Sequence, residues 1–152
     1  MNDYKEIQRG GVIGISLFAS ILVLILGAIY KKQMLGITST SFFVFSLSLL
    51  VIYLLFSSLK TVIEEGKIKL SFGIGLIKKG IPVSSISTVT VVRNKWYYGW
   101  GIRFYGKGWM WNYTGLDAVE INFKNRKSNF RIGSKQAEEL KASIEQQLAK
   151  VK

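Results

Sequence analysis

The residue types from which an enzyme builds a catalytic site are few and badly placed in this chain. It contains no cysteine and no histidine, which removes thiolate nucleophiles, Cys/His zinc sites and the commonest general base. Among the acids, Asp117 and Glu120 are the nearest to a catalytic pair, but residues three apart on a strand point to opposite faces. We therefore expect no enzyme activity, no catalytic residue, no metal site and no cofactor.

Basic residues form the second group with chemical potential, because they attract anions. The chain carries 21 Lys and Arg against 9 Asp and Glu, a formal net charge of +12. Such a surplus attracts lipid headgroups, nucleic acid or an acidic partner without choosing among them. The candidate basic binding residues are Lys78, Lys79, Arg93, Lys95, Arg103 and Lys107. If these basic residues converge on a membrane-facing rim, each of them would add about 1 kcal/mol of attraction to an anionic leaflet. An ordinary solvated face is the alternative, and we favour it.

Aromatic residues are concentrated in residues 96–113, which hold all four tryptophans. Trp and Tyr are typical both of membrane interfaces and of the energetic centres of protein interfaces. The residues expected to pack in a core are Trp100, Trp109 and Trp111. The candidates for an exposed contact are Trp96, Tyr97 and Tyr98, on an apparent loop. Aromatic and basic residues together also suit single-stranded nucleic acid, but no RNP-like or OB-fold pattern accompanies them, so nucleic acid is not an expected partner.

Two uncharged, mostly apolar runs precede these groups. They extend from Gly10 to Tyr30 and from Gln33 to Leu59, with two lysines between them. About 20 apolar residues in a helix span a hydrocarbon core of ~30 Å. The pattern predicts a transmembrane helical hairpin over 12–59, with helices at about 12–30 and 38–59, after a cytoplasmic N-terminal tail at 1–11.

The positive charges next to these runs predict a topology. Lys31 and Lys32 lie on the loop side, whereas six Lys and Arg lie within about 20 residues of the other ends, which favours both termini in the cytoplasm. The expected localisation is the cell (inner, cytoplasmic) membrane, as a multi-pass protein with the bilayer as an integral partner. Gly10 and Gly14 form a G-x-x-x-G that allows close helix approach, and it is compatible with a homo-oligomer without establishing one.

Residues 60–152 are expected to form a separate domain, with strands over about 60–132 and a helix over about 134–150. Ile68, Leu70 and Phe72 alternate with polar residues, as in a half-buried strand. Similar short alternating runs recur up to residue 132. Ser134 is a suitable N-cap, and apolar residues then recur at intervals of three and four, the pattern of an amphipathic helix.

Four stretches resemble those of bacterial membrane proteins that carry two transmembrane helices ahead of a bacterial pleckstrin-homology-like (PH-like) domain, a mostly uncharacterised family. The stretches are Gly80-Ile81-Pro82-Val83-Ser84-Ser85-Ile86, Tyr98-Gly99-Trp100-Gly101-Ile102-Arg103, Trp109–Glu120 and Phe130-Arg131-Ile132-Gly133. The resemblance implies an α+β membrane protein. In it, a transmembrane hairpin precedes a PH-like antiparallel β-barrel or sandwich of seven or eight strands, capped by a C-terminal amphipathic helix.

One departure bears on function. Eukaryotic members that grip phosphoinositides cluster Lys and Arg around the first hairpin, whereas this chain has Glu64-Glu65-Gly66 there. We therefore expect a membrane-anchored, non-enzymatic binding or scaffold protein that presents its PH-like domain to a protein or peptide partner, for example by strand addition at a sheet edge. The alternative is an anionic-lipid-binding domain that uses its basic rim.

Overall fold

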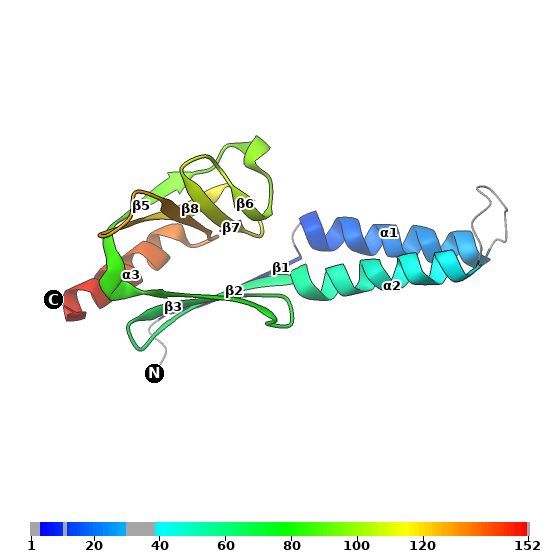
Figure 1. Cartoon of the computed structure of the whole chain (residues 1–152), viewed down its shortest axis with the longest axis horizontal. Helices are drawn as coiled ribbons and strands as arrows, with labels where there is room; N and C mark the ends of the chain where they lie inside the picture. The colour runs from blue at the N-terminus through cyan, green and yellow to red at the C-terminus, as the bar shows by residue number, and fades with distance from the viewer. Residues whose placement is uncertain (1–3, 11, 30–38, 152) are drawn as a thin grey trace.

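The computed structural model describes residues 4–10, 12–29 and 39–151. It contains two β-sheets, a helical hairpin and a C-terminal helix (Figure 1). The elements are, in chain order, β1 (Tyr4–Arg9), α1 (Val12–Ile29), α2 (Ser39–Phe56), β2 (Ser58–Glu64), β3 (Lys67–Phe72), β4 (Ile77–Pro82), the 3₁₀ turn η1 (Val83–Ser85), β5 (Ile86–Arg93), the 3₁₀ turn η2 (Trp96–Tyr98), β6 (Gly101–Phe104), β7 (Gly108–Asn112), β8 (Asp117–Phe123), β9 (Asn129–Gly133) and α3 (Ala137–Val151).

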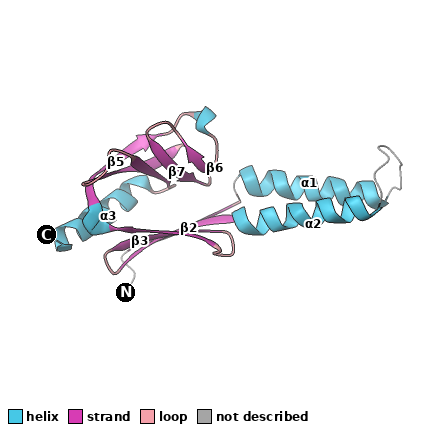
Figure 2. Cartoon of the chain, in the orientation of Figure 1, coloured by secondary structure: helices cyan, strands magenta, loops and turns pink. Residues whose placement is uncertain are grey.

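The strands form two separate sheets (Figure 2). Sheet A is antiparallel and has the order β1-β2-β3-β4. Sheet B has the order β5-β8-β9-β7-β6, in which β7 and β9 are parallel and the other three pairs are antiparallel. The region of about 60–132 in which we expected strands holds β2 to β9, and the alternating run of Ile68, Leu70 and Phe72 is β3, because period-two alternation marks half-buried strands well.

The core lies between the two sheets and is closed on one side by α3. The Phe72 ring of sheet A meets the Trp111 ring of sheet B at 5.3 Å between centroids, and Trp111 in turn meets Phe130. Ala137, Leu140 and Ile144 place the apolar stripe of α3 in the same cluster. The C-terminal helix thus begins three residues later than expected, and it buries Ala137, Leu140 and Ile144 of its apolar stripe.

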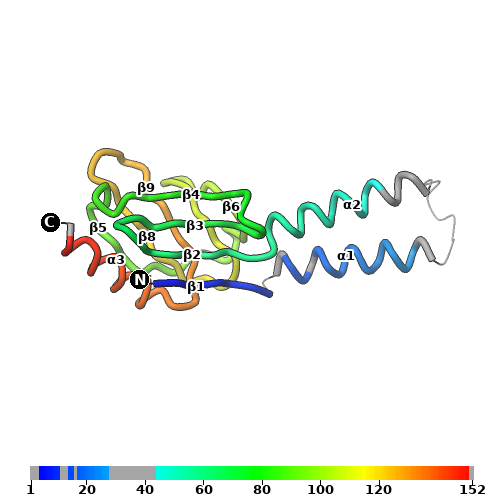
Figure 3. The backbone as a smooth tube through the Cα atoms, turned by 90° about the horizontal axis from the view of Figure 1, so that it is seen from below, coloured from blue at the N-terminus to red at the C-terminus, as the bar shows by residue number. Residues whose placement is uncertain are grey.

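The helical hairpin is inserted between two neighbouring strands of sheet A. β1 enters α1 and α2 leads into β2, and these two strands pair from Tyr4↔Ile63 to Arg9↔Ser58. Figure 3 shows the hairpin continuing from that strand pair. Tyr4–Arg9, which we expected to be a terminal tail, is therefore the first strand of the fold.

Hydrogen bonds from both sheets fix the base of the hairpin. The Ile74 amide, in the β3–β4 turn, donates to the Leu54 carbonyl, and the Tyr113 hydroxyl donates to the Ser57 carbonyl at 2.7 Å. Farther out, apolar side chains such as those of Ile15, Phe18 and Val44 are exposed. The hairpin is thus anchored at one end and lies outside the core.

The predicted transmembrane hairpin is wrong. Within the described residues, no helix combines the length and the apolar character that crossing a membrane requires. α1 and α2 each have 18 residues, about 27 Å at the helical rise, and α2 ends at Phe56 because Ser58–Glu64 belongs to β2. The predicted localisation, a multi-pass protein of the cell membrane with cytoplasmic termini, is overturned by the same finding.

The predicted fold class also needs correction in its strand arrangement. The described chain has nine strands in sheets of four and five, rather than seven or eight strands in one antiparallel barrel or sandwich. The additional strand is β1. Its buried face consists of Tyr4, Glu6 and Gln8, which all carry polar groups, and its exposed face consists of Lys5, Ile7 and Arg9. An apolar alternation signal could not reveal a strand of this kind.

Candidate binding surface

The predicted basic binding residues are spread over both sheets. Lys78 and Lys79 are neighbours on β4, and they point to opposite sides of the strand. Lys78 is exposed, whereas the Lys79 ammonium lies 5.2 Å from the centre of the Phe130 ring on β9. The remaining four are exposed residues of sheet B and its loops: Arg93, Lys95, Arg103 and Lys107. The two lysines of β4 therefore cannot act together as one side of a rim.

The predicted exposed aromatic contact forms a compact ladder of rings on η2. Trp96 and Tyr97 are 76% and 58% exposed, and Tyr98 is half-buried. Successive ring centroids lie 6.0 Å apart for Trp96 and Tyr97, 5.1 Å for Tyr97 and Tyr98, and 6.0 Å for Tyr98 and Tyr105. The first two contacts are edge-on, a favourable geometry for aromatic pairs. We call Trp96, Tyr97, Tyr98 and Tyr105 the aromatic ladder.

Backbone hydrogen bonds hold the turn that carries the ladder. The Asn94 amide donates to the Leu116 carbonyl at 2.7 Å, which ties the segment to the start of β8. The amides of Tyr98 and Gly99 close the 3₁₀ turn onto Lys95 and Trp96. Gly99 leaves the turn with φ of +72°, a conformation that a side chain disfavours. The exposed rings are therefore held on a fixed backbone.

A polar network anchors the inner end of the ladder. The Arg131 Nε atom lies 2.7 Å from Glu120 Oε2, and Arg131 Nη1 donates to Asn94 Oδ1 at 3.0 Å. The Tyr105 hydroxyl also donates to Glu120 Oε2, at 3.1 Å, and the guanidinium lies 4.2 Å from the centre of the Tyr105 ring. Asn94 is 3% exposed, so this network joins the buried base of the loop to the aromatic ladder.

The network shifts two pKa values. Burial and the adjacent Glu120 carboxylate raise the pKa of Tyr105 to about 12. Burial acts to raise the pKa of Glu120, but the hydrogen bond and charge of Arg131 outweigh it and hold that pKa below its usual value. The network therefore holds an ionised Glu120 and a neutral Tyr105 at neutral pH.

Tyr105 predicts an alkaline loss of stability. The pKa of Tyr105 is higher in the folded chain than the ordinary value of about 10. The stabilisation that neutral Tyr105 gives the folded chain is therefore complete below pH ~10 and is lost as the pH rises towards 12. In Tyr105→Phe, we expect the free energy of unfolding to fall less steeply over this range. Urea unfolding of both proteins at pH 9, 10 and 11 measures the two slopes. Equal slopes would contradict the prediction. In that case, a constant difference in the free energy of unfolding between the two proteins would report only the lost hydrogen bond.

Sequence reasoning found η2 but missed the network beneath it. Glu120 and Arg131 are opposite each other on β8 and β9, and Asn94 and Tyr105 come from two different loops. A signal existed in Glu120 and Arg131, since oppositely charged residues on consecutive alternating strands are candidates for a cross-strand pair. Their register, however, depends on where the β8–β9 turn falls.

The three tryptophans expected in the core have different fates. Trp111 is buried between the sheets, as predicted. Trp100 is half-buried, and Trp109 is 53% exposed. The prediction for Trp109 is wrong because it shares the face of Trp111 but lies beside the β6–β7 turn, where it pairs edge-on with the exposed Phe104 at 5.8 Å.

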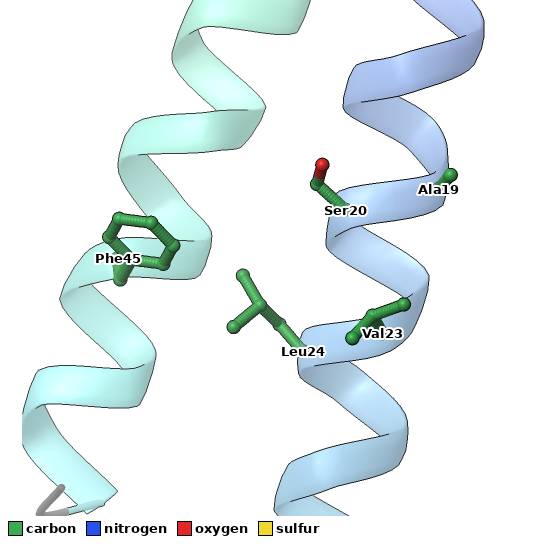
Figure 4. Close-up of a pocket in the computed structure, with 5 residues that line it drawn as sticks. All are labelled: Ala19, Ser20, Val23, Leu24 and Phe45. Carbon is green, nitrogen blue, oxygen red and sulfur yellow. The ribbon is translucent and has the colours of Figure 1, made fainter. Parts of the chain in front are cut away.

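A hollow between α1 and α2 does not resemble a catalytic site. Its volume is about 360 Å³, and it is lined by Ala19, Ser20, Val23, Leu24 and Phe45, with Leu24 and Phe45 facing each other between the helices (Figure 4). Among the described residues that line it, Ser20 alone has a polar side chain. Over the part of the chain that the structure describes, no three His, Cys, Asp or Glu residues are grouped as metal ligands.

Compared with protein-family models and with curated proteins, the chain matches none. The family resemblance of its sequence therefore stays a prediction. The fold and the aromatic ladder define a class at the level of architecture, a two-sheet α+β protein with an inserted helical hairpin and an exposed aromatic loop.

Proposed function

We propose that this chain is a non-enzymatic binding module that presents the aromatic ladder to a protein or peptide partner. The observation that carries the proposal is the combination of exposure and rigidity at Trp96 and Tyr97. Tryptophan and tyrosine dominate the energetic centres of protein interfaces. Because the rings already sit on a fixed turn, little conformational freedom remains to be lost on binding.

Charges around the ladder favour a partner with acidic groups. The Lys95 ammonium lies 5.6 Å from the centre of the Tyr97 ring, and the hydrogen bond with Tyr97 raises the pKa of Lys95. Arg93 is exposed two residues earlier. Positive charge at the rim of an aromatic centre steers an acidic partner and adds specificity.

An anionic lipid surface is less well supported as the partner. Glu64 ends β2 and Glu65 lies in the turn that follows, and both carboxylates lie close to the Lys69 ammonium on β3, at 2.7 and 3.4 Å. The β2–β3 hairpin therefore offers two acids and a lysine that is already paired with them, where a phosphate site needs free cations. Lys78 and Lys79, on opposite faces of β4, supply no second cluster.

Site-specific photocrosslinking tests the proposal. A benzoylphenylalanine probe at Lys95 of the full chain, expressed in the cells that naturally make it, is expected to yield a discrete protein adduct. In the same chain, Trp96→Ala should reduce the adduct at least ~10-fold, because truncating a tryptophan at the energetic centre of an interface costs about 2 kcal/mol or more. Trp96 is exposed, so this substitution should change the free energy of unfolding by no more than ~0.5 kcal/mol.

A probe at exposed Glu138 on α3 serves as the control position and should yield no adduct. Aromatic-centred binding should survive 0.5 M salt, whereas attachment to a charged lipid surface should be largely lost there. The proposal is overturned if the Lys95 probe gives no protein adduct, or if Trp96→Ala leaves the adduct unchanged.

A further inference from the structure

Strand β6 ends sheet B, and its backbone presents an unpaired edge among the described residues. The strand pairs with β7 alone, from Gly101↔Asn112 to Phe104↔Trp109. The Tyr105 amide donates to the Gly108 carbonyl at 3.0 Å, so that pair is hydrogen-bonded. Bonded and non-bonded pairs alternate in an antiparallel ladder. The N–H and C=O groups of Ile102 and Phe104 therefore point away from β7, towards the open edge.

The side chains of β6 alternate in chemical type along this edge. Ile102 and Phe104 share one face, where Ile102 packs against the core and Phe104 is 63% exposed beside Trp109. Arg103 is exposed on the other face. An added strand would therefore meet an apolar, a basic and an apolar residue in succession.

The charge of Arg103 is not neutralised within the described chain. Its Nε donates to the Trp100 carbonyl at 3.1 Å, and no ion pair of its guanidinium occurs among the residues described. The β6–β7 hairpin adds Lys107 and contains no acid. This edge is thus electrostatically complementary to a carboxylate.

Two other sheet edges carry features that oppose strand addition. β4 contains Pro82, which has no N–H to donate, and Gly80. β5 has a register irregularity between Ile86 and Thr88. Bulges and prolines are devices that protect sheet edges, so β6 is a more suitable acceptor than β4 or β5.

We propose that β6 binds an extended segment of a partner polypeptide as an additional strand, with the pattern apolar–acidic–apolar. The acidic residue lies opposite Arg103, and the two apolar residues lie opposite Ile102 and Phe104, where they contact the Phe104–Trp109 pair. Backbone hydrogen bonds provide affinity and the side-chain pattern provides specificity. This inference rests on the proposed function and specifies the chemistry of the partner.

Short synthetic peptides test strand addition on the full, unaltered chain. The probe is acetyl-Thr-Val-Glu-Val-Thr-amide, and its matched control carries Lys in place of Glu. Titration followed by ¹H–¹⁵N NMR should show shifts at Ile102 and Phe104 with the Glu peptide and at least ~10-fold weaker binding of the Lys peptide. A third peptide, N-methylated on both valines, should not bind, because those amides would pair with β6.

A charge swap separates recognition by Arg103 from a merely structural role. Arg103→Glu should reverse the preference, so that the Lys peptide binds better than the Glu peptide. Lys78→Glu, an exposed substitution on sheet A, should leave the preference unchanged. Strand addition at β6 would be overturned if the Glu and Lys peptides bind equally well, or if the N-methylated peptide binds as well as the Glu peptide.

The two proposals fail separately. If no peptide binds while the Lys95 probe still gives an adduct that depends on Trp96, the strand-addition inference is lost and the binding function stands. If the adduct is also missing, both are lost.

Discussion

Replacing Gly108 with alanine is expected to lower the free energy of unfolding by about 3 kcal/mol, the upper end of the usual cost of overpacking. Gly108 begins β7 and lies opposite Asn129 in the parallel pair of β7 and β9. A Cβ at this position would overlap the Asn129 carbonyl oxygen and approach its amide nitrogen. These are backbone atoms of a central strand, so neither can move away without breaking the ladder, and overpacking of this kind is costly.

Gly80→Ala provides the matched control. Gly80 is also a strand glycine, but a Cβ there meets no atom within 4 Å, and its φ is not in the left-handed region. This substitution should change stability by no more than ~0.5 kcal/mol, or stabilise slightly by restricting the unfolded chain. Urea unfolding of the two variants and the unaltered chain measures both effects. Similar losses for Gly80→Ala and Gly108→Ala would mean that the close approach of β7 and β9 is not a constraint.

Local patterns predicted the strands better than the way in which they pair. The alternation of Ile68, Leu70 and Phe72 correctly marks β3, because one face of that strand is buried and the other is solvated. No such pattern specifies that β7 lies beside β9 in parallel, with β6 at the edge. This order depends on hydrogen bonds between the backbones of residues far apart in the chain. Since every residue type except proline offers the same backbone groups, the sequence does not reveal which strands will pair.

The helical hairpin shows where a length argument fails. The apolar run from Gln33 to Leu59 is long enough for a span, but part of it is not helix, because Ser58 and Leu59 already pair with Arg9 and Gln8 in sheet A. Hydropathy registers an apolar residue equally in a helix and in a buried strand. The partner strand, β1, has polar residues on its buried face, so the pairing that ends α2 leaves no apolar signature.

For the candidate binding surface, the sequence predicts the exposed rings but not the polar network beneath them. Trp96 and Tyr97 were expected to be exposed because they follow a polar loop, and they are. Trp109 shows what the alternation of residues cannot predict. Alternation tells on which face of a strand a side chain lies, but not whether the opposite sheet extends far enough to cover it. The supporting network depends on the distance between Arg131 and Asn94, which are 37 residues apart in the chain.

Replacing Glu6 with alanine is expected to be the second large destabilisation, at about 3 kcal/mol, because buried hydrogen-bond donors lose a charged acceptor. Glu6 is 7% exposed, on the buried face of β1, and its carboxylate accepts three hydrogen bonds. The donors are the Tyr4 hydroxyl at 3.0 Å, the Ser134 hydroxyl at 2.6 Å and the Lys135 amide at 2.9 Å. Without the carboxylate, these donors lose their acceptor in a buried site, which costs more than the hydrogen bonds contribute on net.

The position of Glu6 makes its effect extend beyond β1. Ser134 and Lys135 lie just before α3, and the Ser134 hydroxyl in turn accepts from the Gln136 amide at 3.0 Å. An anion at a helix N-terminus is favoured by the exposed amides and by the helix dipole. Glu6 therefore joins the first strand of sheet A to the start of the last helix, and its loss should loosen both.

Hydrogen exchange and urea unfolding distinguish this link from an ordinary loss of packing. In Glu6→Ala, protection against hydrogen exchange should fall in β1 and at the Lys135 amide by more than the global free energy of unfolding falls. In β8, protection should fall only by as much as the global free energy does. Lys5→Ala, an exposed neighbour on the same strand, should cost no more than ~0.5 kcal/mol. Glu6→Gln, which keeps one acceptor oxygen, should fall between the two. If Glu6→Ala costs no more than Lys5→Ala, then the buried carboxylate does not couple β1 to α3, and β1 is held by its pairing with β2 and by the Gln8 side-chain hydrogen bond to the Gly133 carbonyl.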